Sequence, residues 1–274
     1  MMLGFASGCF LERRKEFVVP HRVPEDLKPF PVELQVGRGY DYSDFDRVVS
    51  IHLPFMLYKL LKVEGVTVYK KLREVNIASL DEDFWRDDFE LFKRYLTEAA
   101  DKKVEYAVFH YGRCNCVGRL WRDEAHRKLH WAREKEFLIG LSEIAAGSGI
   151  KLLTENHPYD DRIFLNHIKH IKEIVERDYA GFCLDFPHAF YRFKRFGDAS
   201  LNRIITRFRE SIQEVHLADN NGLSHAPSAL DKGKIDWRKL LSLFRSSLLV
   251  IIELRENPLE SLERAWEVML KALR

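Results

Sequence analysis

The chain has 274 residues, which is long for an ordinary domain but normal for a single α/β barrel. Hydrophobic residues make up 46% of the chain, enough for a large core, so a disordered protein is excluded. The 44 basic and 42 acidic side chains leave a formal net charge of +2, so no overall charge draws the protein to nucleic acid, although a local basic patch fits this balance.

The usage of particular residue types indicates the compartment. The cysteines, Cys9, Cys114, Cys116 and Cys183, form no disulfide framework, and the pair at 114 and 116 is spaced too closely for a typical zinc clip. Charged residues follow the short apolar run at the start of the sequence, the reverse of a secretory signal, and no stretch approaches the roughly 18 apolar residues of a membrane span. We therefore expect a cytoplasmic protein without a membrane partner. Scarce glutamine and 31% charged residues resemble the composition of thermophile proteins.

Eight short apolar runs, most of them separated by amphipathic stretches, follow one another along the chain. The runs predict strands over Leu3–Ala6, Val32–Val36, Val48–Leu53, Tyr106–His110, Ile150–Glu155, Gly181–Asp185, Ile212–His216 and Leu248–Glu253. The amphipathic stretches predict helices over Asp83–Ala100, Trp131–Ala146, Phe164–Arg177, Leu201–Glu210, Trp237–Arg245 and Leu259–Leu273. This alternation indicates a parallel sheet, and eight repeats favour closure into a (β/α)8 TIM barrel. No composition shift marks a boundary, so we expect one domain over residues 1–274, with a basic insertion at about 113–133 after the fourth strand.

Residue types that bind metals close six successive predicted strands. They are His52, His110, Glu155, Asp185, His216 and Glu253, and His188 lies three residues after Asp185. Active sites of such barrels are built at the C-terminal ends of the strands. A carboxylate at the end of an apolar strand is costly to bury without a charged partner or a metal. The strand ends therefore predict one metal-binding site at this mouth of the barrel.

Several of these motifs carry a family resemblance that runs over nearly the whole chain. Glu155-Asn156, Leu184-Asp185 with His188, His216 with Asp219, and Glu253 resemble the shared metal positions of the xylose isomerase-like barrel superfamily. That superfamily holds sugar isomerases, epimerases and dehydratases as well as the DNA-repair enzyme endonuclease IV. For the sugar enzymes the resemblance implies one divalent metal held by Glu155, Asp185, His216 and Glu253. For endonuclease IV it implies three zinc ions, with His52, His110 and His188 joining as ligands.

Two branches of this superfamily share the remaining motifs. His52 before Leu53-Pro54-Phe55, and His110 before Tyr111-Gly112, look similar to the endonuclease branch. The repair enzymes, however, follow strand seven with an Asp-Arg-His that feeds the third zinc, and this chain has Leu223-Ser224-His225 there. The runs Asp219-Asn220-Asn221-Gly222 and Lys232-Gly233-Lys234-Ile235-Asp236-Trp237 look more like the sugar branch, although Asp231 stands where that branch often has Gly.

The chemistry of the ligand set orders the functional hypotheses. Three carboxylates and one imidazole suit Mn, Mg or Co, and Zn becomes favoured if His52 and His110 also bind metal. Glu155 and Glu253 could remove a proton beside a substrate carbonyl and return one, with the metal stabilising an enediolate. We therefore expect a metal-dependent isomerase or epimerase of a sugar or sugar-phosphate-like substrate, without an organic cofactor. The alternative is an endonuclease IV-like phosphodiesterase acting on abasic DNA, and the third hypothesis is a non-catalytic ligand-binding barrel.

Other residues receive secondary roles. His52, His110, His188 and His225 are candidates for a second metal or for contacts with substrate. Asp219 fits either a partner of a metal ligand or a cap after strand seven. Arg113, Arg119 and Arg122 are candidates for an anion clamp, against the plainer interpretation of a solvated surface. His126, His130 and His170 are predicted on exposed helix surfaces. Glu33 is predicted within the core or supporting the site. A second copy of the chain is a candidate partner.

Overall fold

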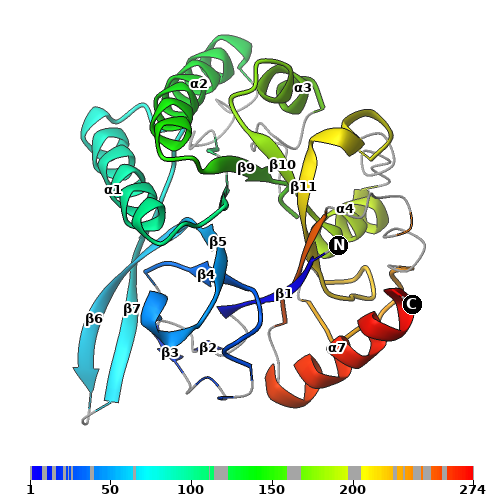
Figure 1. Ribbon diagram of the computed structural model, residues 1–274. Helices are drawn as coiled ribbons and strands as arrows, with labels where there is room; N and C mark the ends of the chain where they lie inside the picture. Colours follow the sequence, from blue (N-terminus) through cyan, green and yellow to red (C-terminus); the bar gives the residue numbers. More distant parts are fainter. Residues whose placement is uncertain are drawn as a thin grey trace.

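The computed structural model describes residues 2–7, 11–13, 17–20, 23, 25, 27–37, 40–63, 66–110, 112–113, 123–158, 168–196, 205–224, 227–230, 232–236, 242, 248–254 and 258–273. A closed barrel of parallel strands forms its centre, in the order β1-β12-β11-β10-β9-β8-β5-β4 (Figure 1). The strands are β1 Met2–Ala6, β4 Val32–Gln35, β5 Val48–His52, β8 Tyr106–Phe109, β9 Lys151–Glu155, β10 Gly181–Asp185, β11 Ile212–Leu217 and β12 Leu249–Ile252. Each lies within one residue of its predicted bounds, which confirms the predicted barrel.

Helices cover the outside of the barrel. They are α1 Glu82–Asp101, α2 Glu124–Gly147, α3 Ile168–Glu176, α4 Phe186–Phe196 and α7 Pro258–Leu273, with short 3-10 turns η2 Tyr42–Asp44 and η5 Arg209–Ser211. The first two begin at aspartate caps, because Asp81 accepts from the Phe84 N–H and Asp123 accepts from the His126 N–H. Among the described residues, no α-helix lies between β1 and β5.

Three predictions about helices need correction. The helix predicted from Trp131 begins at residue 124, so residues 124–133 of the predicted basic insertion belong to α2, while residues 114–122 lie outside the described part. His130 and His170, predicted as exposed, are only 4% and 7% exposed. The His130 ring contacts the Ala78 carbonyl at 2.5 Å, and the His170 ring lies 4.2 Å from the Trp131 ring. Both imidazoles are therefore buried against neighbouring segments instead of facing solvent.

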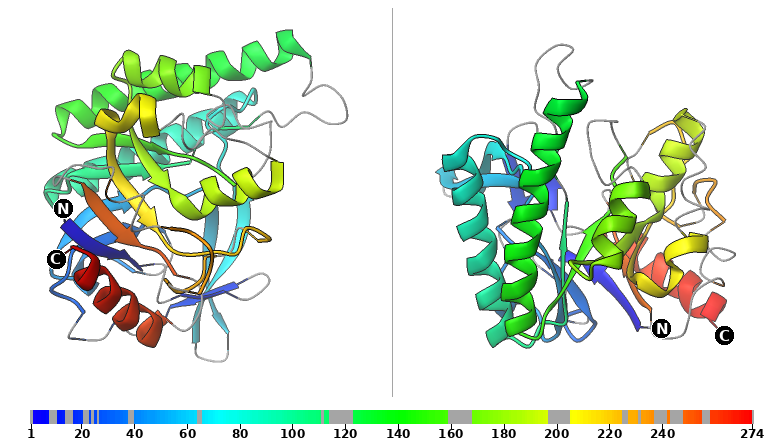
Figure 2. Two further views of the ribbon diagram at one scale, coloured as in Figure 1. Left: turned by 90° about the vertical axis from the view of Figure 1, so that its right-hand side faces the viewer. Right: turned by 90° about the horizontal axis from the view of Figure 1, so that it is seen from above.

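The main apolar core lies between the strands and the surrounding helices. Figure 2 shows α1 and α2 side by side on the outside of the barrel. Phe137 of α2 meets the rings of Trp85, Phe89 and Phe92 of α1 edge-on, at centroid distances of 5.5, 5.2 and 5.6 Å. Inside the barrel, Val108, Leu153 and Cys183 form a separate small apolar cluster. No helix in the described part of the chain is long and apolar enough to cross a membrane.

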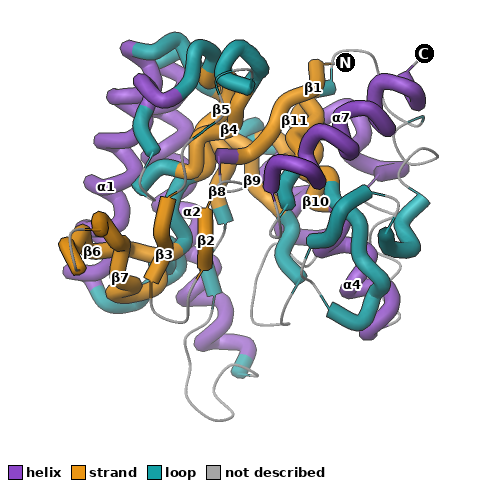
Figure 3. Tube along the Cα trace, turned by 90° about the horizontal axis from the view of Figure 1, so that it is seen from below, coloured by secondary structure: helices purple, strands orange, loops and turns teal. Residues whose placement is uncertain are grey.

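A four-stranded antiparallel sheet accompanies the barrel, and its strands are not among the predicted elements. Its strands are β2 Leu11–Arg13, β3 Phe17–Pro20, β6 Met56–Val63 and β7 Val66–Glu74, in the order β2-β3-β7-β6. The two pairs follow the C-terminal ends of β1 and β5, so the sheet is attached on the side of the barrel mouth. Figure 3 shows it beside α1, to which the Arg73–Asp88 ion pair joins it.

Candidate functional site

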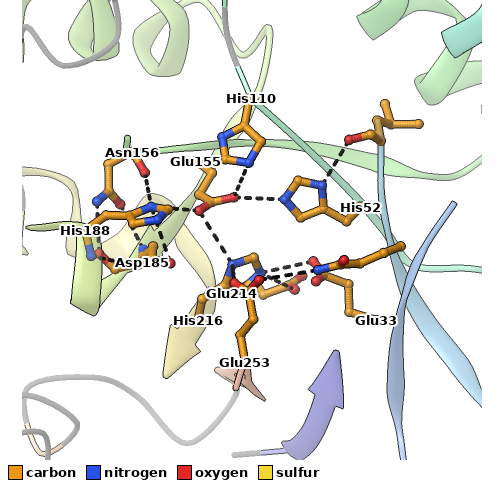
Figure 4. Close-up of polar contacts among 12 residues, drawn as sticks. Glu33, His52, His110, Glu155, Asn156, Asp185, His188, Glu214, His216 and Glu253 are labelled. Atoms are coloured by element: carbon orange, nitrogen blue, oxygen red, sulfur yellow. Dashed lines mark hydrogen bonds and ion pairs between the residues drawn. The ribbon is translucent and has the colours of Figure 1, made fainter. Parts of the chain in front are cut away.

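Glu155, the last residue of β9, lies at the centre of the barrel mouth and meets four imidazoles (Figure 4). Its Oε2 lies 3.0 Å from His52 Nε2 and 3.5 Å from His110 Nε2. Its Oε1 lies 3.2 Å from His188 Nδ1 and 3.7 Å from His216 Nδ1. Because these side chains come from four other segments of the barrel, the carboxylate joins the strand ends into one cluster.

The four predicted metal ligands converge on this cluster. Strand register places Asp185 opposite His216 on the neighbouring strand. Ligand atoms of Asp185, His216 and Glu253 lie within 4.8 Å of one another, and His216 Nδ1 is 3.7 Å from Glu253 Oε2. Glu155 forms two similar groups, one with Asp185 and His188 and one with His52 and His110. The site therefore has adjoining groups that could each hold a divalent ion, and two of the three share the Glu155 carboxylate.

The local sequence after β9 and β10 fixes two of these side chains. Asn156 Oδ1 accepts from the Asp185 N–H at 2.8 Å, and its Nδ2 donates to the Asp185 carbonyl at 2.9 Å. Helix α4 starts directly after β10, and the Asp185 carboxylate accepts from the His188 N–H at 2.5 Å as a cap. The His188 Nδ1 lies 3.0 Å from the Asn156 carbonyl. Asn156, which follows the neighbouring strand β9, therefore holds both Asp185 and His188 in place.

Hydrogen bonds to the histidine rings indicate which nitrogens face the site. His52 Nδ1 lies 3.0 Å from the Leu53 carbonyl, which can only accept, so Nε2 is left facing Glu155. His216 Nε2 lies 3.0 Å from Glu33 Oε2, which leaves Nδ1 facing Glu155 and Glu253. The Nδ1 atoms of His110 and His216 are buried without a hydrogen-bond partner. Of these two, only the His216 Nδ1 faces Glu155 and Glu253, because His110 faces Glu155 through Nε2. A metal ion satisfies such an orphaned imidazole nitrogen, so the donor set fits one.

Burial and crowding shift the protonation equilibria of the cluster. Burial, opposed by the His188 imidazole, raises the pKa of Asp185 to about 7. Burial alone would lower the pKa of His188, but the Asp185 and Glu155 carboxylates raise it to about 9. Burial lowers the pKa of His110 well below its usual value. Burial would raise the pKa of Glu155, but the imidazoles of His110 and His216 hold it well below the usual range. Without a metal, protonated histidines balance the negative charge of the carboxylates. A bound divalent ion would supply that positive charge in place of those protons.

The immediate surroundings leave room for an ion. A cavity of about 10 Å³ lies among Asp185, His188, His216 and Glu253, and this volume suits a single water or ion. Glu253 has a side chain that is 17% exposed, the most of the four predicted ligands, and Gln35 Nε2 donates to its Oε1 at 3.4 Å. Glu253 is therefore the most accessible of the four predicted ligands.

The site includes Glu33, which the sequence predicts within the core or supporting the site, and also Glu214 and His157, for which it predicts no role. Glu33 and Glu214 are fully buried next to the His216 ring, and the His157 ring lies 5.5 Å from the His110 ring and 5.9 Å from the His188 ring. The available signal for Glu214 was its spacing: it lies two residues before His216, and side chains two apart in a strand point to the same face.

The remaining predicted site residues lie farther from the cluster or outside the described part. Asp219 Oδ1 accepts from the backbone N–H groups of Asn220 and Ile235, at 2.8 and 3.0 Å, which is a capping role. The guanidinium of Arg113 forms an ion pair with Glu74 of β7. Arg119, Arg122 and His225 lie outside the described residues, so their predicted roles stay predictions.

Comparisons with known proteins agree with this architecture. A family model described as a xylose isomerase-like TIM barrel matches residues 47–274. An uncharacterized protein of Methanocaldococcus jannaschii is 24% identical, and the match covers all of both chains. A D-tagatose 3-epimerase-like protein has a similar structure, with a TM-score of 0.74, 18% identity, and coverage of 100% of this chain and 97% of the other. Endonuclease IV from Thermus thermophilus gives a TM-score of 0.60 and 16% identity, covering 100% of this chain and 99% of the other.

Proposed function

The chain belongs to the xylose isomerase-like TIM barrel family, and we propose that it is a divalent-metal-dependent isomerase or epimerase of a sugar or sugar-phosphate-like substrate. One observation carries the proposal: the carboxylates of Glu155 and Glu253 each lie 3.7 Å from the same His216 nitrogen. Two carboxylates therefore flank a single ion position. The likeness to the D-tagatose 3-epimerase-like protein supports this choice among the family's reactions.

Two flanking carboxylates suit proton transfer at carbon. Isomerisation and epimerisation remove a proton from the carbon beside a carbonyl and return one to a neighbouring atom or to the opposite face. The ion, held by Glu155, Asp185, His216 and Glu253, would polarise the carbonyl oxygen and so acidify that carbon-bound proton. Glu253 is the more exposed of the two flanking carboxylates, so we assign it the contact with the carbon-bound proton. His188 and His157 would contact substrate oxygens at the rim.

The test is the exchange of substrate protons with solvent. The wild type, loaded with Mn, Co, Mg or Zn, is incubated in deuterated buffer with a panel of ketoses and ketose phosphates, and deuterium at carbon is measured by NMR. Glu253→Gln keeps the shape and removes the proton acceptor, so we expect exchange to fall by about 10²–10⁴-fold. The matched control, Glu82→Gln on the exposed side of α1, should exchange like the wild type. Exchange at the wild-type rate in Glu253→Gln would sink the proposed role.

A second candidate function is favoured by a specific observation. The side chains of His52, His110 and Glu155 form their own candidate ion position beside the first, and two adjoining ions suit hydrolysis of a phosphate ester. The likeness to endonuclease IV supports this alternative. Against it, Leu223 stands where the repair enzymes have an aspartate, and its side chain is 85% exposed.

Incision of abasic DNA separates the two functions. The purified protein, with added Zn or with EDTA, is incubated with a labelled duplex that carries one abasic site. We expect no incision in either condition, because Leu223 supplies no ligand for a third ion. Metal-dependent incision by the wild type would replace the isomerase proposal with the phosphodiesterase, and the barrel and its ligands would be unaffected. The anion clamp formed by Arg113, Arg119 and Arg122 stays a proposal under either function.

A further inference from the structure

Two carboxylates lie inside the barrel, one layer below the candidate metal ligands. Glu33 of β4 and Glu214 of β11 are both fully buried. Each precedes an inward-facing residue of the mouth by two positions, which places it on the same face of its strand and deeper in the barrel. A buried carboxylate is costly unless it has a hydrogen-bonded partner. For both, the neighbouring donor is the His216 ring (Figure 4).

The geometry distinguishes the two carboxylates. His216 Nε2 donates to Glu33 Oε2 at 3.0 Å. Glu214 Oε1 lies 3.4 Å from the same nitrogen, and neither of its oxygens has a hydrogen-bond partner. Because an imidazole Nε2 carries at most one proton, it can donate a good hydrogen bond to only one of the two carboxylates. Glu33 accepts that hydrogen bond.

We propose that Glu33 is the residue that positions His216 as a metal ligand. By accepting the Nε2–H, it fixes the orientation of the ring and directs the Nδ1 lone pair at the space between Glu155 and Glu253. That Nδ1 is fully buried and has no hydrogen-bond partner, which is the arrangement of a ligand nitrogen. The proposal rests on the metal-dependent function proposed above, and Glu33 touches neither ion nor substrate in it.

A comparison with His52 shows what Glu33 adds. The ring of His52 is oriented by a neutral acceptor, the Leu53 carbonyl, at the same distance of 3.0 Å. The ring of His216 is oriented by a carboxylate in the deepest part of the site. A carboxylate partner makes an imidazole a stronger ligand, and its charge in a low-dielectric interior attracts a cation. His216 should therefore be the ligand whose outer partner affects metal affinity most.

The test uses matched variants of the two carboxylates. Glu33→Gln keeps an oxygen that can accept the Nε2–H but removes the charge, and Glu33→Leu removes both. Glu214→Gln is the control, because it alters a carboxylate of equal burial beside the same nitrogen that lacks the hydrogen bond. Co(II) affinity is measured by competition with a chelator, and the paramagnetically shifted ring N–H of His216 is followed by proton NMR.

The expected pattern follows from the hydrogen bond. Glu33→Leu should weaken Co(II) binding by about 10–100-fold and lose the shifted N–H signal. Glu33→Gln should retain the signal with a smaller loss of affinity, and Glu214→Gln should bind Co(II) within about threefold of the wild type. If Glu33→Leu does not fold, the comparison of Glu33→Gln with Glu214→Gln carries the test. These measurements need no turnover, so they can support the inference even if the isomerase proposal fails.

Two results would overturn it. One is an equal loss of Co(II) affinity in Glu214→Gln and Glu33→Gln. That result would mean that the buried negative charge, and not the hydrogen bond to His216, determines the affinity. The other concerns Cys183, whose sulfur lies within 4.8 Å of ligand atoms of Glu214 and His216. Metal analysis that finds an ion lost on Cys183→Ser and on Glu214→Gln would show a metal at Nε2 instead of a proton.

Discussion

Glu134 is a buried carboxyl group that contacts the segment after His110, next to the candidate site. It lies on α2, is fully buried, and its Oε1 accepts from the Gly112 N–H at 3.3 Å, two residues beyond His110. Its Oε2 has no hydrogen-bond partner. A glycine fits at position 112 because a Cβ there would collide with Ala78. The segment that follows the His110 strand end is therefore held by a group whose charged form is poorly tolerated.

The pH dependence of stability should report this group. Burial raises the pKa of Glu134 well above its usual value, so the folded state holds a proton that the unfolded chain releases. That contribution is intact below the unfolded carboxyl pKa and is lost as the pH rises toward the folded pKa. Glu134→Gln keeps an acceptor for Gly112 and cannot ionise. We expect it to exceed the wild type in free energy of unfolding by about 1–3 kcal/mol at pH 8 and to match it near pH 4.

Urea unfolding at the two pH values measures the difference, with the exposed Glu143→Gln on the same helix as control. Parallel pH profiles for Glu134→Gln and the wild type would show that Glu134 is not the group responsible. Helical spacing from Trp131 to Leu138 puts Glu134 on the apolar face of α2, but the sequence alone does not show which other segment buries it.

In the candidate site, too, contacts with other segments decide which residues the sequence can predict. Residues that close strands, such as Glu155 and Asp185, could be predicted, because an apolar run that ends in a carboxylate is visible in the sequence alone. Glu214 could not be assigned a role from the sequence, because the interior of a barrel usually holds apolar side chains and a buried acid depends on a partner from another strand. The partner, His216, is predicted as a ligand, but the sequence does not show which group its second nitrogen meets.

At the scale of elements, the barrel strands were predicted because they are buried on both faces and therefore nearly continuous in apolar residues. The antiparallel sheet was not predicted, because its strands mix residues that pack toward the core with charged residues that are exposed. Tyr58 and Tyr69 pack toward the core, while Lys59, Lys70 and Lys71 are exposed. Such strands give a weak signal that a short helix can imitate.

The junction between this sheet and α1 depends on one buried aspartate. Asp88 of α1 is fully buried and accepts from Arg73 of β7 at 2.8 and 3.1 Å and from the Asn76 N–H at 3.1 Å. Asp88→Ala leaves the guanidinium and the Asn76 N–H without their acceptor, so the free energy of unfolding should fall by about 2–4 kcal/mol. Asp87→Ala, at the neighbouring exposed position, should change it by less than about 0.5 kcal/mol.

Urea denaturation followed by circular dichroism provides the comparison, and hydrogen exchange of the β7 amides locates the loss. We expect faster exchange in β7 and unchanged protection in β10 of the Asp88→Ala protein. Equal stabilities for the two alanine variants would mean that the sheet is held by its packing and not by this ion pair.

At the scale of the whole molecule, charge is concentrated where the last four barrel strands end. Glu155, Asp185, His216 and Glu253 close β9, β10 and β11 and follow β12, and three of the four are carboxylates. Bringing them together without a cation opposes folding, since buried like charges repel. An ion bound there would join four neighbouring strands, and because the unfolded chain has no such site, its binding energy adds to the free energy of unfolding.

Metal binding should therefore raise the thermal stability of the entire barrel. At an ion concentration of about 100 times the Kd, the expected gain is about 2.7 kcal/mol, or roughly 5–10 °C in Tm for a chain of this size. Calorimetric scans with Mn, Co, Mg or Zn, each repeated with EDTA, measure the shift. Asp185→Asn keeps an acceptor for the His188 N–H but weakens the ligand set, so its Tm should respond less to metal, whereas Asp87→Asn should respond like the wild type. A Tm that is the same with every ion and with EDTA would contradict a metal site at the barrel mouth, and with it the isomerase proposal.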